Sequence, residues 1–451
     1  ELHRRAGGWF ERQHDVEEAV YHYLAAEAYP EATALMEQVA MEWFTRGRIE
    51  TLLRWGGSLP EEVRSCAPRL MLYQSKALTD RYHYEAARHA LTLAEAGFCQ
   101  HGNIGRLARV HVQRATLGLF EGCYDEVIEE AQTALEMLSA SEVSERAQAQ
   151  RLIGRAYLGK GSVAKGIAEL QGALKLYQQV GSPYNTANLL QDLAFAYTSQ
   201  GRFDEAAAYL GKALPLARRL GSPTQLAGVL NSLGWIHDVR GEYQEALKLY
   251  EEGLAAARRG EDPRSQANIA EGMAAVYRNI GNYRRAEFLY DVAWRIAHEG
   301  RPVLAVLILI GRADMYRWQG DHARALTLLE QARNLAEEKG LDTERDGLLR
   351  VMEGIASVEK GTTERGLRLL SNGISFLEDQ GAKRDLARGY FLLAKAHLLG
   401  GEERQAVSEL RRALELGDEM GTNQFAVVEG QHAPELLELG ISEGITVCRG
   451  I

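Results

Sequence analysis

Cysteine and proline are scarce in this sequence, and both shortages are informative. Nine prolines stand beside 45 glycines in 451 residues, a balance that indicates many helices ending at glycine caps. The four cysteines, Cys66, Cys99, Cys123 and Cys448, are scattered singly and form no CxxC pair. This pattern argues against a disulfide framework and against a zinc site, so we expect a reducing, cytoplasmic compartment.

Net positive charge and long apolar runs are also missing. The formal charge is −10, whereas a generic binder of nucleic acid or anionic membrane needs a basic face. The longest apolar run, residues 303–310, is far shorter than the roughly 20 residues of a spanning helix. The first residues, ELHRRAGGWF, contain no initiator methionine and no signal-peptide core, and we expect a domain excised from a longer protein.

What the sequence does contain is a repeat of about 40 residues. Glycines recur 39 to 41 residues apart, and similar sequence surrounds each one, as in DLAFAYTSQGRFDEAAAYLGKAL and SLGWIHDVRGEYQEALKLYEEGL. These hinge glycines are Gly122, Gly161, Gly201, Gly241, Gly281, Gly320, Gly361 and Gly401. Each is predicted to join two antiparallel helices, here called A and B.

Small residues keep a fixed distance from every hinge. Only alanine or glycine stands seven residues before it and twelve residues after it, and Val127 is the one exception at five residues after it. Two helices approach closely only where the side chains at their crossing are small, which places these columns between A and B. Larger residues, such as Tyr250 and Tyr290, are predicted to fill the space between hairpins. The predicted fold is therefore an all-α solenoid of stacked helical hairpins.

These columns resemble the tetratricopeptide repeat, lengthened from 34 to 40 residues. The N-terminal sequence Leu2-His3-Arg4-Arg5-Ala6 with Trp9, Glu18-Ala19 and Ala32, followed by RGRIETLLRWGGSLPEEV and APRLMLYQSKAL, resembles the MalT-like sensor domain of STAND-class transcription activators. The resemblance implies a right-handed superhelix whose A helices line a concave groove. It also implies that the nucleotide-binding and DNA-binding modules lie outside this chain, which contains no G-x-x-x-x-G-K-[ST] motif.

Both ends depart from the regular repeat. Residues 1–67 are predicted to form two shorter, atypical hairpins, and residues 68–421 the superhelix, which starts with a degenerate repeat that has Ala86 in a small-residue column. Residues 422–451 are predicted to be a capping helix and tail. The sequence GTNQFAVVEGQHAPELLELG in this tail resembles what precedes the effector region of related regulators.

No set of residues indicates catalysis. Cys99 and His101 are two residues apart, but no third partner is nearby, so we expect no catalytic residue, no metal and no cofactor in this chain.

One stripe of each A helix is predicted to face the groove, at 13, 10, 6 and 3 residues before the hinge. Amides and aromatic rings on this A-helix stripe suit a polar ligand such as an oligosaccharide or a peptide backbone. Its charged members could read ionic ends of a ligand or could pair with one another. The candidate ligand-binding residues are Asn188, Gln191, Phe195, Asn231, Trp235, Asp238, Asn268, Glu271, Arg278, Asp314 and Arg317.

Toward the C-terminus the same stripe becomes apolar, with Leu307, Ile310, Leu348, Val351, Ile355, Val358, Phe391 and Leu398. Such a stripe needs a cover. Inter-repeat packing, a partner, or the tail residues Phe425, Val427, Val428, Leu436 and Leu437 could provide it.

The sequence thus predicts a ligand-sensing domain of a STAND-type activator. It would bind a small polar inducer or a peptide, relay that binding to its own NTPase and DNA-binding modules, and contact neither nucleic acid nor membrane. The alternative is a tetratricopeptide scaffold for protein–protein interaction without a small-molecule inducer.

Overall fold

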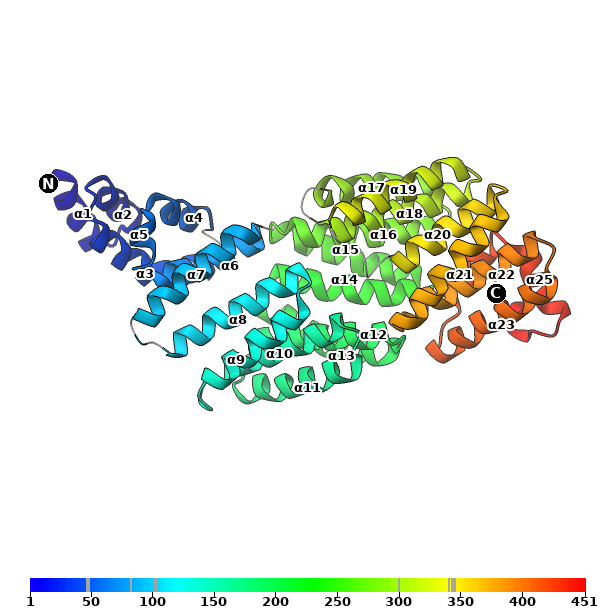
Figure 1. The fold of residues 1–451 in the computed structure, drawn as a ribbon, viewed down its shortest axis with the longest axis horizontal. Coiled ribbons are helices and arrows are strands. Elements are labelled where there is room, and N and C mark those ends of the chain that lie inside the picture. The colour runs from blue at the N-terminus through cyan, green and yellow to red at the C-terminus, as the bar shows by residue number, and fades with distance from the viewer. Residues whose placement is uncertain are drawn as a thin grey trace. The chain divides into compact units, whose positions relative to one another are not determined.

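A computed structural model describes residues 1–45, 49–81, 83–100, 102, 104–298, 301–339, 341 and 346–451 of the chain. These residues form 25 α-helices and one short 3-10 helix, and no strand occurs among them. The chain divides into two compact units, residues 1–181 and residues 182–451, which are described separately (Figure 1).

The first unit consists of eleven helices. They are α1 (Leu2–Arg12), α2 (Val16–Ala25), α3 (Tyr29–Thr45), α4 (Ile49–Ser58), α5 (Glu61–Arg64), α6 (Pro68–Asp80), α7 (Tyr84–Gln100), α8 (Ile104–Glu121), α9 (Tyr124–Met137), α10 (Val143–Gly159) and α11 (Val163–Gln179). Hairpins from α6/α7 onward pair consecutive helices, as the repeat predicts.

The second unit holds the remaining helices. They are α12 (Pro183–Ser199), α13 (Phe203–Leu220), α14 (Pro223–Val239), α15 (Tyr243–Arg259), α16 (Pro263–Asn279), α17 (Tyr283–Ala297), α18 (Pro302–Trp318), α19 (His322–Glu338), α20 (Asp346–Glu359), α21 (Thr363–Gln380), α22 (Lys383–Leu399), α23 (Glu403–Met420), α24 (Gln424–Gly430), α25 (Pro434–Ser442) and η1 (Thr446–Arg449). Even-numbered helices from α12 to α22 are the A helices of this unit.

The predicted hinges are confirmed. All eight hinge glycines lie between two helices and have φ between 73° and 99°, in the left-handed region that only glycine enters without strain. Consecutive A helices also pack directly on one another, so they occupy the inner side of each unit.

The small-residue columns are confirmed as the crossings of A and B. Every alanine of the three columns is buried. The backbones meet where the residue is glycine: a Cβ on Gly366 would lie 2.6 Å from the carbonyl oxygen of Gly354. Tyr250 and Tyr290 are buried and contact the next A helix. Their rings or hydroxyls would lie within 2.6 Å of a Cβ added to Gly272 or Gly311.

One position in the degenerate repeat is predicted wrongly. Ala86 is exposed on α7, whereas its neighbour Ala87 is fully buried. The glycine hinge that fixes the register elsewhere is absent before this helix, and the register is therefore off by one residue.

Most of the apolar part of the A-helix stripe is covered by protein, whereas Leu307 and Leu398 are half-buried. Val351 lies against Gly373 of α21 and Gly389 of α22, so that part of the stripe belongs to the inter-repeat core. Phe391 is buried and its ring meets that of Phe425, from the tail, edge to face at 6.3 Å. Both proposed covers, inter-repeat packing and the tail, are therefore present.

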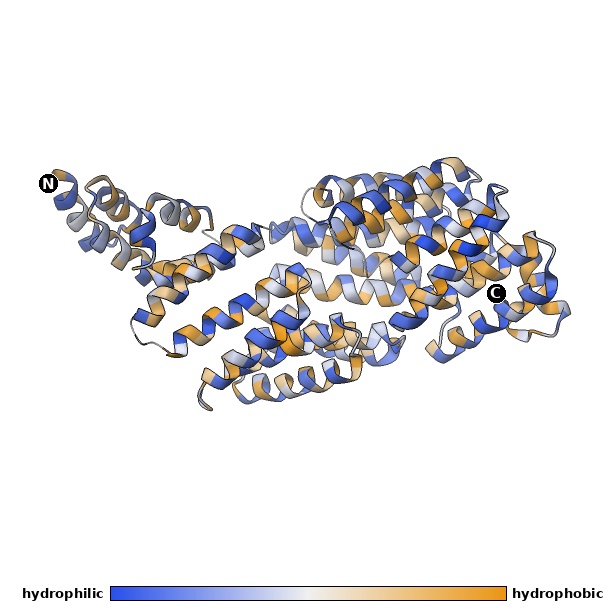
Figure 2. Cartoon of the chain, in the orientation of Figure 1, coloured by the Kyte–Doolittle hydropathy of each residue, from blue (hydrophilic) through white to orange (hydrophobic). Residues whose placement is uncertain are grey.

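Hydrophobic and hydrophilic residues alternate along the helices of both units (Figure 2). Among the described residues, no helix is long and apolar enough to span a membrane.

Candidate functional site

The A-helix stripe of the second unit is open at its beginning. Seven stripe residues on α12, α14 and α16 are accessible: six are half-buried, and Phe195 is 66% exposed. This open stretch consists of Asn188, Gln191, Phe195, Asn231, Trp235, Asn268 and Glu271.

Neighbouring side chains hold some of the amides in the open stretch in place. Gln225 donates through Nε2 to Oδ1 of Asn188 at 2.8 Å, and Arg301 donates through Nη1 to Oδ1 of Asn268 at 3.0 Å. These bonds engage the amide oxygens and leave the NH2 groups of Asn188 and Asn268 as donors. Asn188 and Asn268 therefore present their NH2 groups in a fixed orientation.

Trp235 is the aromatic centre of the open stretch. Its ring meets that of Phe203 edge to face at 5.9 Å, and the guanidinium carbon of Arg384, from α22, lies 5.5 Å from its centroid. A half-exposed aromatic ring supported on two sides suits stacking against the apolar face of a ligand.

The other four candidates lie in a closed part of the stripe. Asp238, Asp314 and Arg317 are buried, and the side chain of Arg278 is 14% exposed. Of the two alternatives for these charged residues, the structure shows pairing. Arg317 donates to Asp314 at 3.3 Å, and Arg278 lies 3.7 Å from Asp314.

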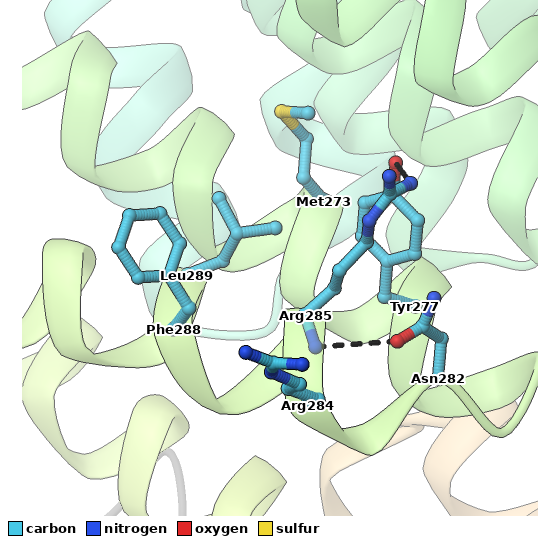
Figure 3. A pocket seen from close by; sticks show the side chains of 7 residues that line it. All are labelled: Met273, Tyr277, Asn282, Arg284, Arg285, Phe288 and Leu289. Atoms are coloured by element: carbon cyan, nitrogen blue, oxygen red, sulfur yellow. Dashed lines mark hydrogen bonds between the residues drawn. The ribbon is translucent and has the colours of Figure 1, made fainter.

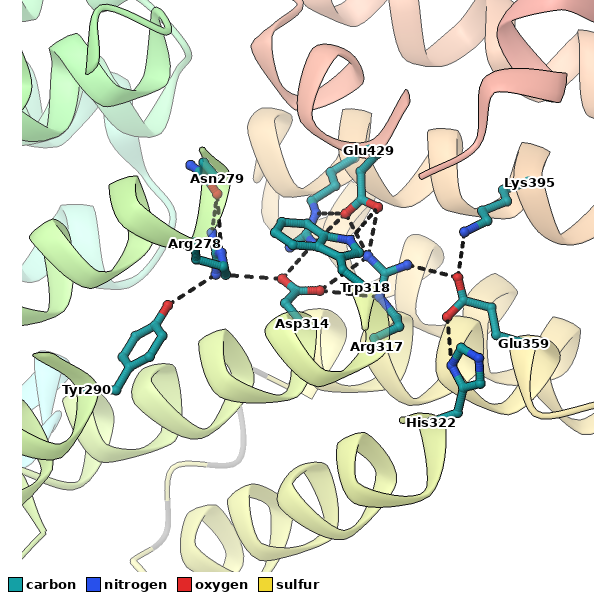
Figure 4. A network of polar contacts seen from close by, with 11 residues as sticks. Arg278, Asn279, Tyr290, Asp314, Arg317, Trp318, His322, Glu359, Lys395 and Glu429 are labelled. Atoms are coloured by element: carbon teal, nitrogen blue, oxygen red, sulfur yellow. Dashed lines mark hydrogen bonds and ion pairs between the residues drawn. The ribbon is translucent and has the colours of Figure 1, made fainter. Parts of the chain in front are cut away.

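Arg278, Asp314 and Arg317 belong to a larger buried charge cluster (Figure 4). It consists of Arg278, Asp314, Arg317, Glu359, Arg388, Lys395 and Glu429.

Glu429, from helix α24 of the tail, is at the centre of the cluster. Arg317 Nη2 reaches Glu429 Oε2 at 2.7 Å, and Arg388 Nη2 reaches Oε1 at 2.5 Å. Trp318 donates through Nε1 to Oε2 at 3.3 Å. Asp314 completes the ring by accepting from Arg388 at 2.6 Å, and Glu359 accepts from Arg317 at 3.0 Å and from Lys395 at 2.6 Å.

Sequence reasoning missed several members of this cluster. Arg388 and Lys395 stand at two of the predicted stripe positions of α22, 13 and 6 residues before Gly401, where only the apolar Phe391 and Leu398 were considered. Trp318 and Glu359 both stand two residues before a hinge, a column that also faces this region. This column is the sequence signal that could have identified Trp318 and Glu359. Nothing in the repeat pattern indicated Glu429, which lies beyond the last repeat.

Paired cations set the ionisation of the central carboxylate. Burial alone would raise the pKa of Glu429, but Arg317 and Arg388 outweigh it and hold the pKa of this carboxyl well below its ordinary range. Glu429 is therefore ionised at neutral pH. Asp238 differs, because burial raises the pKa of its carboxyl in spite of Arg384 and Arg278.

Acidification is expected to destabilise the chain through His432, whose ring stacks on Trp318 at 4.9 Å and 10°. Burial lowers the pKa of His432, and Arg317 and Lys395 act in the same direction, while Glu429 and Glu359 oppose them. The unfolded state takes up a proton near pH 6.5, but the folded state does so only at lower pH. Stability present above about pH 6.5 is thus lost as the pH falls below it.

The measurement is the melting temperature between pH 7.5 and 5.5 for the wild-type chain and for His432→Asn. We expect a smaller fall for the variant, since it has no imidazole to protonate. Equal slopes for the two proteins would contradict the assignment.

A separate open pocket of about 560 Å³ lies on α16 and α17 (Figure 3). Arg285 covers the ring of Tyr277 at 5.3 Å and donates to its hydroxyl at 3.2 Å, and Phe288 beside it is 67% exposed. None of the candidate ligand-binding residues lines it.

No group of three metal-ligating side chains occurs in the part of the chain that the structure describes. Cys99 is exposed near the end of α7, and His101 falls outside the described residues.

The hinges, small-residue crossings and inner A helices define a tetratricopeptide-type helical solenoid. The model of the MalT-like TPR region matches residues 108–439, and the chain belongs to this family. A comparison with curated protein sequences gives no match.

Several solved structures share the fold. A Rap protein complexed with competence and sporulation factor is 15% identical, with a TM-score of 0.63 over 79% of this chain and 99% of that one. The apo form of the quorum sensor NprR from B. thuringiensis is 15% identical, with a TM-score of 0.54 over 77% and 97%. Aspartyl phosphate phosphatase F from Bacillus subtilis is 13% identical, with a TM-score of 0.53 over 70% and 91%. At these identities the likeness concerns the fold alone.

Proposed function

We propose that this chain is a ligand-sensing domain of a STAND-type transcription activator, binding a polar inducer or a peptide on its inner A-helix face. The observation that carries the proposal is the contrast along one stripe. The charged and apolar members of the stripe on α18 and α20 are buried, except for the half-buried Leu307, whereas the amides and rings on α12, α14 and α16 remain accessible. An accessible row of oriented amides beside aromatic rings is suited to binding rather than to catalysis.

Membership in the MalT-like family supports this proposal, as do two proteins of the same fold. One was solved with competence and sporulation factor, and the other is a quorum sensor. Binding on the A-helix face would bias the packing of the second unit, and this change would be relayed to nucleotide-binding and DNA-binding modules of the full-length regulator.

Trp235 provides the test. Sugars, peptides and nucleotides are first screened for a rise in the melting temperature of the chain, since a ligand at 100 times its Kd stabilises the folded state by about 2.7 kcal/mol. We expect Trp235→Ala to abolish the shift given by any true inducer, because the variant removes the stacking surface. The ligand-free variant should keep its helical circular dichroism.

Phe288→Ala is the matched control, because it removes an exposed ring from the pocket on α17 and leaves the open stretch intact. An inducer that still stabilises Trp235→Ala but no longer stabilises Phe288→Ala would overturn the proposal.

A further inference from the structure

A segment near the C-terminus lies on the A-helix face that the ligand is proposed to use. The C-terminal segment, residues 420–432, contacts four separate parts of the second unit. Met420 packs against the hinge Gly201, and Thr422 Oγ1 donates to the carbonyl oxygen of Val239 at 3.0 Å. Gln424 Nε2 donates to the hydroxyl of Tyr243 at 2.8 Å. Glu429 and His432 then reach Trp318, as described above.

This segment is ordered by its docking. Helix α24 has only seven residues, and a helix this short is not stable alone in water. Side chains of the segment make polar contacts to residues more than 100 positions away in the sequence, and Glu429 also pairs with Arg388, 41 positions away. In proteins, segments of this kind open locally as cooperative units.

The strongest anchor is the carboxylate of Glu429. Two guanidinium groups and an indole N–H converge on it, and the residue is 1% exposed. If the segment leaves, four cations of the cluster, Arg278, Arg317, Arg388 and Lys395, keep only Asp314 and Glu359 as carboxylate partners within it. The vacated position is therefore complementary to an anion, and the fork of Arg317 and Arg388 suits a carboxylate.

We propose that the C-terminal segment is a displaceable occupant of the A-helix face, and that the ligand displacing it is a peptide whose acidic side chain replaces Glu429 between Arg317 and Arg388. This inference rests on the proposed function and specifies the ligand class. A peptide is favoured because the present occupant is itself a peptide. Its one continuous chain makes the hydrogen bonds to Val239 and Tyr243 and also places the carboxylate of Glu429. The amides of the open stretch lie on the same A-helix stripe and are available to the rest of the ligand.

The test uses the full chain and two synthetic peptides. One is MGTNQFAVVEGQHAP, the sequence of residues 420–434, and the other has glutamine in place of its glutamate. Binding is measured by fluorescence anisotropy of the labelled peptides to the wild-type chain and to Glu429→Gln. We expect the glutamate peptide to bind the variant at least tenfold more tightly than the wild type, because the tethered competitor has lost its anchor. The glutamine peptide should bind the variant at least tenfold more weakly than the glutamate peptide.

Glu435→Gln is the matched control, since Glu435 is exposed six residues further along the chain. Its peptide affinity should equal that of the wild type. Equal affinity of both peptides for Glu429→Gln, or no binding of either, would overturn the inference.

A second readout needs no variant. Hydrogen exchange at the amides of residues 424–430 in the wild-type chain should accelerate when the glutamate peptide is added in excess, and should not do so with the glutamine peptide. If Glu429→Gln does not fold, this measurement decides alone. An inducer that depends on Trp235 but leaves this exchange unchanged would support the proposed function and overturn the present inference. Exchange that accelerates with the glutamate peptide, when no inducer depends on Trp235, would support the present inference and overturn the proposed function.

Discussion

Replacing Arg317 with methionine is expected to reduce the free energy of unfolding by about 3–5 kcal/mol. The Arg317 side chain is 1% exposed and pairs with Asp314, Glu359 and Glu429. Methionine fills a similar volume but leaves these three carboxylates with fewer cations in a region that water does not reach. A buried charge that loses its partner is costly, because neither solvent nor protein replaces the lost interaction.

Urea denaturation followed by far-ultraviolet circular dichroism measures the loss. The control is Arg368→Met, because Arg368 pairs with Glu364 at the surface, where the two side chains are 68% and 87% exposed. Such a pair contributes at most about 1 kcal/mol. Adding Glu429→Leu to Arg317→Met should recover part of the loss, since it removes one of the unpaired charges. Similar losses for Arg317→Met and Arg368→Met would show that the cluster is not the buried network described here.

The pairing within this cluster could not be predicted from the sequence. The positions that face the inner side follow from helical periodicity and from the hinge register, and both are local properties of the repeat. Whether such a position is open or closed depends on contacts between residues far apart in sequence, as for Arg317 and Glu429, 112 positions apart. Periodicity carries no information on such pairs, so Phe195 and Arg317 were given the same role although one is exposed and the other is buried.

The composition of the stripe also led to an incomplete prediction for α22. On α22 the apolar residues Phe391 and Leu398 indicated a hydrophobic surface, although Arg388 and Lys395 stand on the same stripe. Arg388 and Lys395 alternate with those apolar residues on one helical face, and this alternation indicates a face that is buried yet carries paired charges. The fold itself was predictable, because small residues at a helix crossing are a steric requirement that the sequence must meet at every repeat.

That steric requirement is most severe in the hairpin of α20 and α21, where all three small-residue columns are glycine: Gly354, Gly366 and Gly373. We expect Gly373→Ala to cost about 1–3 kcal/mol of stability, and the cost to be at the upper end of that range. A Cβ at this position would lie 2.7 Å from the carbonyl oxygen of Gly347 and 2.9 Å from the backbone nitrogen of Val351. Backbone atoms of a neighbouring helix cannot rotate away as a side chain does, so the two helices must separate.

The same substitution at Gly211 is expected to act in the opposite direction. Gly211 lies within α13, is exposed, and a Cβ there would have no neighbour within 4 Å. Alanine is favoured over glycine inside a helix by up to about 1 kcal/mol, so Gly211→Ala should stabilise the chain. Urea midpoints of the two variants, measured side by side, give the comparison. Because the chemical change is identical, opposite signs isolate the close approach of the two backbones as the cause, whereas a gain in stability for both would mean that α20 and α21 are not in contact at Gly373.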